Sequence, residues 1–217
     1  PEVTQWDEAG GTIVLTTLPG QTLHDLLTGV VPAVVATEVG RAVRTLHSAA
    51  TAPDGTTTHD LAAEVDATRA LLDLARTHRA LQPREALVVD RRIAAAAATI
   101  AALARPAAPS LLHRDLHDKQ LLVDGASIGM LDVDTLGLGD PALDLGNLLA
   151  HLDLRVRQGW TQRETAAAVE QGVLDGYVPD DRTRAATAGY RALAAARLEA
   201  LYAFRPGDLT GGGQPAK

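Results

Sequence analysis

Apolar residues recur at helical spacing through most of the chain. Val35, Val39 and Val43 lie four residues apart, so they would share one face of a helix. We expect that helix over residues 33–49. Similar spacing, bounded by proline, glycine or polar residues, predicts further helices over residues 61–78, 84–103, 141–158, 161–177 and 181–204.

Polar residues stand where several of these helices would begin. Thr22 can cap a short helix over residues 23–27 with its hydroxyl group. Thr161 and Glu164 have the spacing of a capping box. Asp140 would cap the helix that follows it, with a proline at the first helical position.

Short apolar runs between turn residues predict β-strands. Asp124-Gly125 is a tight turn between two of these runs, which would form a small hairpin. The order of one early strand, several helices, a β-loop-β core and more helices predicts an α+β, mostly helical fold. The predicted strands cover residues 11–18, 110–113, 120–123 and 128–132.

Composition narrows the class of protein. Of the 217 residues 46% are hydrophobic but only 3% aromatic, so Leu, Val, Ile and Ala would pack helices closely. A net charge of −7 argues against a nucleic-acid or anionic-membrane partner.

Without cysteine there is no disulfide or thiolate metal site, which fits a reducing cytoplasm. No apolar run is long enough to span a bilayer. We expect a soluble, cytoplasmic protein.

The chemistry is concentrated between residues 111 and 152. Asp115 follows an apolar strand and stands between two histidines. A carboxylate held there can orient a substrate hydroxyl, or accept its proton, while the hydroxyl attacks a γ-phosphate. Asp115 is therefore the candidate catalytic residue.

A second set of polar residues offers hard oxygen ligands to a metal ion. Asp132 ends the second strand of the hairpin, and Gln120 lies five residues after Asp115. Mg²⁺ takes one or two protein carboxylates together with phosphate oxygens and water. Asp134 would point to the same side if the chain continued extended, which makes it a reserve ligand.

These stretches resemble the catalytic core of the aminoglycoside phosphotransferase and choline kinase superfamily, which has a bilobal, protein-kinase-like fold. The resemblance implies that Asp115 is the catalytic base and that Asp132 and Gln120 hold Mg²⁺ with ATP or GTP. It also implies a small-molecule hydroxyl as the phosphate acceptor. The matching stretches are His113-Arg114-Asp115 with Gln120, Leu131-Asp132, and Gly137-Leu138-Gly139-Asp140-Pro141 running to Asp144-Leu145.

The chain departs from the family pattern in two ways. The family's asparagine is Gln120 here, whose extra methylene shifts the side-chain oxygen by about 1.5 Å in a site with strict geometry. No strand lysine or glycine-rich phosphate loop precedes the motif. We therefore expect a C-lobe, either a truncated gene product or a trimmed form, whose N-lobe is another segment or a partner chain. The expected division is residues 1–20 as the last N-lobe strand and hinge, 21–207 as the C-lobe with its core at 109–152, and 208–217 as a disordered tail.

Other polar residues receive supporting roles. We expect His113 to bury its ring and bond to the backbone, and of the two histidines His117 is the better candidate for direct contact with the substrate. Asp144 would belong to a core network. Arg114, His117, Asp134 and Asp144 together are candidates for substrate contact or for support of the site. We place His24 and His47 at the surface or at helix caps, Arg155 on an exposed face, and Asp118 in an acidic cluster facing a cationic substrate.

Two functions remain open on the sequence. Asp115 and Asp132 favour a small-molecule phosphotransferase, while Gln120 and the missing lysine favour a non-catalytic module that binds a small molecule or a protein. The substrate is not determined: aminoglycosides, macrolides, choline-like amines, homoserine, sugars and a peptide hydroxyl all fit. Selection would depend on residues 55–105 and 150–204. The scarcity of aromatic residues disfavours a choline cage.

Overall fold

The computed structural model describes residues 2–103 and 108–205. The expected disordered tail, residues 208–217, lies outside the described residues. Helices predominate, as the sequence predicts, and every predicted helix is present with ends within two residues of those expected. The helices are α1 (Leu23–Leu26), α2 (Ala33–His47), α3 (Leu61–Thr77), α4 (Pro83–Ala101), α5 (Ala142–Arg157), α6 (Arg163–Tyr177) and α7 (Asp181–Tyr202), with 3₁₀ turns η1 (Asp118–Gln120) and η2 (Val133–Thr135).

The strands form three small sheets in the described part of the chain. β1 and β2 make an antiparallel hairpin, β3 joins the β6–β7 hairpin, and β8 lies between β4 and β5. The strands are β1 (Val3–Asp7), β2 (Thr12–Leu15), β3 (Gln21–Thr22), β4 (Thr58–His59), β5 (Ser110–Leu112), β6 (Leu121–Asp124), β7 (Ser127–Met130) and β8 (Gly137–Gly139).

Helix starts agree with the sequence in part. The Thr22 hydroxyl accepts a hydrogen bond from Asp25 N at 3.1 Å, as predicted. The predicted capping box at Thr161 is wrong, because α6 begins at Arg163 and the Thr161 hydroxyl is buried with no hydrogen-bond partner. The Asp140 carboxylate accepts from Ala142 N at 3.0 Å, but α5 begins at Ala142, one residue later than expected, so Pro141 precedes the helix.

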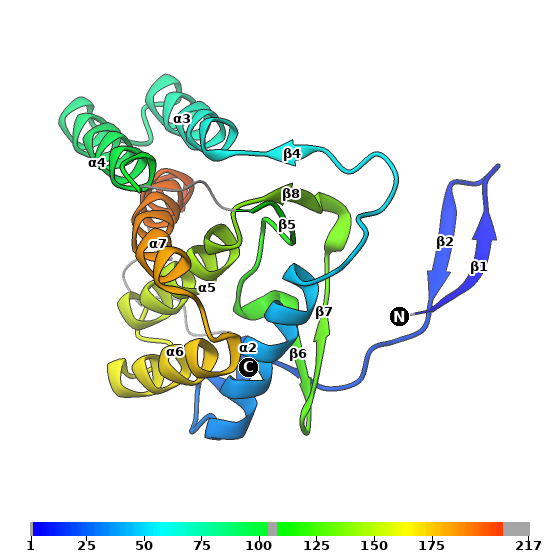
Figure 1. Ribbon diagram of the computed structural model, residues 1–217. Coiled ribbons are helices and arrows are strands. Elements are labelled where there is room, and N and C mark those ends of the chain that lie inside the picture. Colours follow the sequence, from blue (N-terminus) through cyan, green and yellow to red (C-terminus); the bar gives the residue numbers. More distant parts are fainter. Residues whose placement is uncertain (1, 104–107, 206–217) are drawn as a thin grey trace.

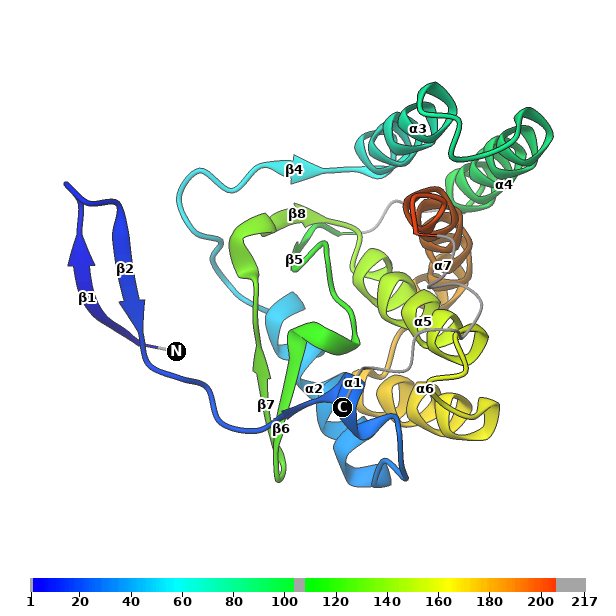
Figure 2. The same ribbon diagram turned by 180° about the vertical axis from the view of Figure 1, so that it is seen from behind.

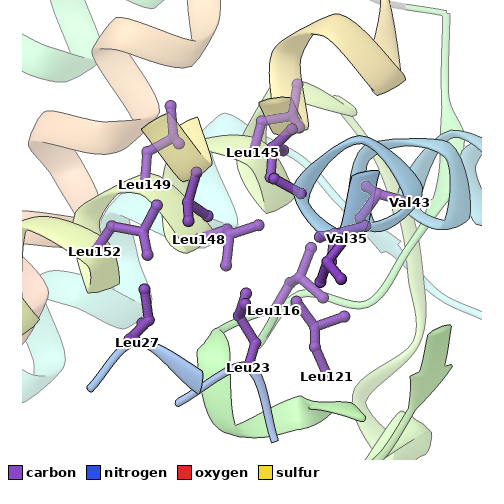
Figure 3. Packing of buried hydrophobic residues seen from close by; sticks show 14 of the residues in the cluster. Leu23, Leu27, Val35, Val43, Leu116, Leu121, Leu145, Leu148, Leu149 and Leu152 are labelled. Carbon is purple, nitrogen blue, oxygen red and sulfur yellow. The ribbon is translucent and has the colours of Figure 1, made fainter. Parts of the chain in front are cut away.

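The main core surrounds α5, which is buried along most of its length. Leu145, Leu148 and Leu152 of α5 face α1, α2 and the β6 strand (Figure 3). Leu116, fully buried, brings the loop between β5 and β6 into this core. The loop is thus anchored by an apolar side chain next to its polar ones. A second cluster joins α3, α4 and α7 through smaller side chains.

The β1–β2 hairpin stands apart from the remaining elements in both views (Figures 1 and 2). Every residue of its two strands is exposed, and Trp6 keeps 70% of its surface accessible. The sheets that carry the central loops instead lie beside the helices, with α2 next to β5 and β7 and α3 following β4 (Figure 1). Among the described helices, none is both long and apolar enough to cross a bilayer.

Candidate active site

The loop of residues 113–120 connects β5 to β6 and carries Asp115. Arg114 adopts a left-handed conformation with φ of 70°, which a non-glycine residue adopts only when its surroundings hold it. The buried Asp144 carboxylate accepts the backbone N–H groups of His113 and Arg114 at 2.7 and 2.8 Å. Asn147 donates to the carbonyl of Arg114 at 2.7 Å. Two side chains of α5 therefore fix the backbone immediately before Asp115.

His113 ties this loop to the next one. Its ring is fully buried, and Nε2 donates to the carbonyl of Leu131 at 2.7 Å, which confirms the predicted placement. Thr135 donates from its hydroxyl to the carbonyl of His113 at 2.8 Å. Arg114 Nη1 donates back to the carbonyl of Thr135 at 3.2 Å. The loop bearing Asp115 and the loop bearing Asp132 thus form one connected unit.

Asp115 itself remains accessible. Half of its side-chain surface is exposed, and its Oδ2 lies 3.8 Å from His117 Nε2. His117 Nδ1 accepts the backbone N–H of Lys119 at 3.1 Å, so the neutral ring carries its proton on Nε2, toward Asp115. The Asp115 carboxylate is therefore open to solvent beside the His117 ring.

Gln120 and Asp132 meet across the two loops. Gln120 Nε2 donates to Asp132 Oδ2 at 3.0 Å, although the residues lie twelve positions apart. Asp132 has a left-handed backbone with φ of 59°, at the point where β7 gives way to η2. Because the amide nitrogen holds one carboxylate oxygen, the amide oxygen and the second carboxylate oxygen stay available. These are hard donors of the kind that Mg²⁺ prefers.

Asp134 does not continue an extended strand. Residues 133–135 form the 3₁₀ turn η2, so the condition for Asp134 to point with Asp132 is not met. Its side chain is exposed to solvent.

Asp118 departs most clearly from expectation. The sequence predicts it in an acidic cluster facing a cationic substrate, but its side chain is fully buried and accepts from Arg155 Nε at 2.8 Å and Nη2 at 3.1 Å. His24 Nδ1 lies 2.5 Å from the same carboxylate. Burial alone raises the pKa of Asp118, yet the bonds from His24 and Arg155 outweigh it and hold the pKa below its usual range.

The predictions for Arg155 and His24 are wrong for the same reason. Arg155 is 4% exposed rather than on a solvated face, and His24 stacks on Trp160 with ring centroids 4.4 Å apart. A carboxylate buried in the loop requires cationic and donor partners, which draws both residues inward.

His47 is also misplaced by the sequence interpretation. It is buried at the end of α2, where Nε2 bonds Asp144 Oδ2 at 3.0 Å and Nδ1 bonds the Tyr177 hydroxyl at 2.8 Å. The expected core network around Asp144 is therefore present, and His47 belongs to it. Burial raises the pKa of Tyr177 to about 12, so its hydroxyl stays protonated.

His117, Asp118 and His151 lie close enough together to suggest a second metal site. The two imidazole rings stack with centroids 4.7 Å apart. However, Arg155 and His24 already occupy the carboxylate of Asp118, and a divalent cation would have to displace the guanidinium group. We therefore favour Asp132 with Gln120 as the metal ligands.

The sequence reasoning missed Asn147, His151 and Arg155. With Asp144 they follow a spacing of three, four and four residues along α5, so they form one polar stripe on a helix whose other buried residues are Leu, Ala and Gly. That stripe faces the loop of residues 113–120. A polar stripe on a buried helix is the signal that could have identified them.

A comparison with models of known protein families gives a match over most of the chain. The family model described as "Phosphotransferase enzyme family" matches residues 3–196. No curated protein gives a significant match.

Solved structures with a similar fold include a choline/ethanolamine kinase family protein from Mesorhizobium loti, at 21% identity and a TM-score of 0.66. That match covers 95% of this chain and 65% of the other, so this chain spans about two thirds of that protein's length. An aminoglycoside phosphotransferase from Streptomyces rimosus, in complex with ADP and streptomycin, is 20% identical with a TM-score of 0.59. Here 91% of this chain and 75% of the other are covered. At these identities the likeness concerns the fold.

Proposed function

This chain belongs to the phosphotransferase enzyme family, and we propose that it moves the terminal phosphoryl group of ATP or GTP to a hydroxyl group of a small molecule. One observation carries the proposal. The loop bearing Asp115 and the loop bearing Asp132 are joined by the hydrogen bond between Gln120 and Asp132. An exposed carboxylate and a set of oxygen donors are thereby held on one rigid unit, which is what phosphoryl transfer requires of a protein.

In this proposal Asp115 is the catalytic base. Its half-exposed carboxylate can accept a hydrogen bond from the substrate hydroxyl and take its proton as the oxygen attacks the phosphorus. Asp144 and Asn147 hold the preceding backbone, so little reorganisation is needed when the substrate binds. His117 presents an N–H group toward Asp115 and stands beside the acceptor position.

Asp132 and Gln120 are the proposed metal ligands. Mg²⁺ bound there would neutralise charge on the phosphate oxygens of the nucleotide. The longer side chain of Gln120 reaches Asp132 and orients its carboxylate, so the departure from asparagine is compatible with a working site. His113 supports the same loop through the carbonyl of Leu131.

The division of the chain follows from this assignment. We propose that residues 21–207 form the lobe that supplies the base and the metal ligands, with residues 1–20 as the strand and hinge that lead into it. The separation of the β1–β2 hairpin from the helices supports this division (Figure 2).

A transfer assay tests the proposed function. The protein is incubated with Mg²⁺ and ATP or GTP labelled at the γ-phosphate, together with aminoglycosides, macrolides, choline-like amines, homoserine and sugars. We expect label on at least one class of hydroxyl compound. Asp115→Asn should abolish the transfer, while Asp124→Asn in the exposed β6–β7 turn serves as the matched control.

Two results would count against the proposal. Transfer that survives Asp115→Asn unchanged would remove Asp115 as the base. Nucleotide binding without transfer to any acceptor, or to water, would favour the alternative of a non-catalytic binding module, to which the replacement of the family's asparagine by Gln120 also points.

A further inference from the structure

A buried polar cluster lies directly beneath the proposed active site. Asp118, fully buried, lies three residues after Asp115 and two before Gln120. Arg155 and His24 donate to it, and Trp160 stacks on His24. We call Asp118, His24, Arg155 and Trp160 the Asp118 cluster. None of these four side chains has a role in the chemistry proposed above.

The cluster joins elements that are far apart in the sequence. His24 belongs to α1 and lies 94 residues from Asp118, while Arg155 is near the end of α5 and lies 37 residues away. Trp160 Nε1 donates to the carbonyl of His24 at 2.9 Å, which fixes the backbone beneath the ring. Arg155 Nη1 also donates to Gln158 Oε1 at 2.7 Å, so the guanidinium group is held on both sides.

Helix α1 also links the Asp118 cluster to the strand that follows Gln120. It follows β3 directly, and β3 pairs with β6, the strand that begins where Gln120 ends. The cluster therefore braces the η1 turn from α5 below and from the β3–α1 segment at its side. The η1 turn contains Gln120 itself.

A buried carboxylate with these partners is a demanding arrangement. Removing a charge from water is unfavourable, and the loss is recovered only when the charge is paired and fully hydrogen-bonded. An apolar side chain at position 118 could pack in the core without any charged or hydrogen-bonding partner. The directed bonds of a carboxylate fix an orientation, which apolar contacts do not.

We propose that Asp118 is a positioning residue, which through Arg155 and His24 sets the orientation of the η1 turn and hence of Asp115 and Gln120 on either side of it. This inference rests on the proposed function in assigning roles to those two residues. The cluster acts on the loop, and it touches neither nucleotide nor acceptor.

Asp118→Asn tests the inference, with Asp153→Asn as the matched control. An asparagine at 118 turns an N–H group toward Arg155 or His24, which are themselves donors. Asp153 lies on α5, as Arg155 does. Its carboxylate accepts two hydrogen bonds of 2.7 Å from Arg191, and no described hydrogen bond joins it to the loop of residues 113–120. Thermal unfolding midpoints of both variants show how much general stability each has lost.

Hydrogen exchange of the peptides covering residues 113–121 gives the first readout. We expect exchange about tenfold or more faster in Asp118→Asn than in Asp153→Asn. Similar exchange in the two variants would overturn the inference. This comparison does not depend on activity, so it holds even if nucleotide fails to bind and the proposed function itself is wrong.

The turnover of the variants gives the second measurement. It should not change specifically in Asp118→Asn if Asp118 only stabilises the fold. We expect turnover at saturating Mg·ATP to fall about tenfold or more in Asp118→Asn and to stay within about twofold of the unaltered protein in Asp153→Asn. Equal losses of turnover in Asp118→Asn and Asp153→Asn would overturn the positioning role. If the unaltered protein does not bind the nucleotide, that result contradicts the proposed function instead.

A pair of variants at His24 keeps the test decisive if Asp118→Asn does not fold. His24→Asn keeps an N–H donor near the position of Nδ1, whereas His24→Leu removes it. We expect His24→Asn to keep the exchange of residues 113–121 slow and His24→Leu to make it faster. Equal exchange in both would show that the bond to Asp118 does not hold the loop.

Discussion

Single polar residues of α5 determine the conformation of the loop that carries Asp115. Asp144 and Asn147 bind its backbone, and Arg155 binds its buried carboxylate at Asp118. These contacts hold Arg114 in a conformation that would otherwise be unfavourable. The exposed carboxylate of Asp115 thus depends on buried partners that never meet solvent.

Asp115→Asn tests the role of the base. We expect phosphoryl transfer to fall by about 10²–10⁴-fold, because an amide cannot accept the proton of the acceptor hydroxyl. The Kd for Mg·nucleotide should change little, since Asp115 is not among the proposed metal ligands. Transfer rates and calorimetric titrations of the same preparations measure the two effects. Equal transfer in the variant would remove Asp115 from the mechanism.

Gln120→Asn tests the metal ligand. We expect the variant to keep transfer, or to use Mg²⁺ better, because asparagine offers the same oxygen on a shorter side chain. The dependence of the initial rate on Mg²⁺ concentration gives the measurement. A complete loss of transfer would show that the loop requires the longer reach to Asp132.

His151 makes folding stability depend on pH. Burial is the main cause that lowers its pKa from 6.5 to about 3, so the folded protein keeps the ring neutral where the unfolded chain protonates it. Protons therefore favour the unfolded chain, and stability falls as the pH decreases from about 6.5 toward 3. One such group contributes a slope of at most about 1.4 kcal/mol per pH unit.

His151→Leu should flatten this dependence. Urea unfolding between pH 4 and 8 measures the slope, and His78→Leu at an exposed position is the control. Some slope should remain, because burial also lowers the pKa of His117. A slope unchanged by His151→Leu would contradict the assignment.

At the residue scale the sequence predicts which residues lie near each other within one short segment better than it predicts their buried partners from distant segments. Asp115, Gln120 and Asp132 follow from motif spacing along one short segment. The sequence predicts Arg155 on an exposed face, His47 at the surface or at a helix cap, and Asp118 in an acidic cluster facing a substrate, because polar residues usually lie near solvent. Their partners come from distant parts of the chain, so local spacing carries no information about them.

At the scale of elements, α2 and α6 approach each other closely through glycine. A Cβ atom on Gly40 of α2 would meet the carbonyl of Val173 and lie 2.7 Å from Tyr177 N, both on α6. The contact also aligns the two helices whose ends carry His47 and Tyr177. Close packing of these helices therefore supports the Asp144 network.

Gly40→Ala should lower the free energy of unfolding by about 1–3 kcal/mol, because the neighbouring atoms belong to a helix backbone that cannot move aside alone. The matched control is Gly29→Ala, where the nearest atom to the added methyl group is 4.0 Å away. Denaturant unfolding of both variants measures the difference. Equal stability of the two would show that α2 and α6 can separate at little cost.

The sequence predicts long elements more readily than short ones. Helices of fifteen or more residues, such as α2 and α7, repeat their apolar period several times. β4 and β8 were missed because they contain two and three residues, and β8 is the glycine-rich GLG. They exist through pairing with each other and with β5, which sequence patterns along one strand do not reveal.

For the whole molecule, the arrangement joins one well-packed helical body to a hairpin that lies outside it (Figure 1). The proposed base and metal ligands all belong to the helical body, on loops that α5 supports through Asp144, Asn147 and Arg155. The chain spans about two thirds of the kinase family protein from Mesorhizobium loti that it resembles in fold. The residues proposed for its activity lie on the loops of this helical body.

Calorimetric titration with Mg·ATP and Mg·GTP tests the central claim most directly, with Asp132→Ala compared to Asp124→Ala at an exposed position of the neighbouring turn. The account predicts metal-dependent binding of one nucleotide to the unaltered protein and to Asp124→Ala, and its loss in Asp132→Ala. Binding that is independent of Mg²⁺, or unaffected by Asp132→Ala, would contradict the assignment of the metal site.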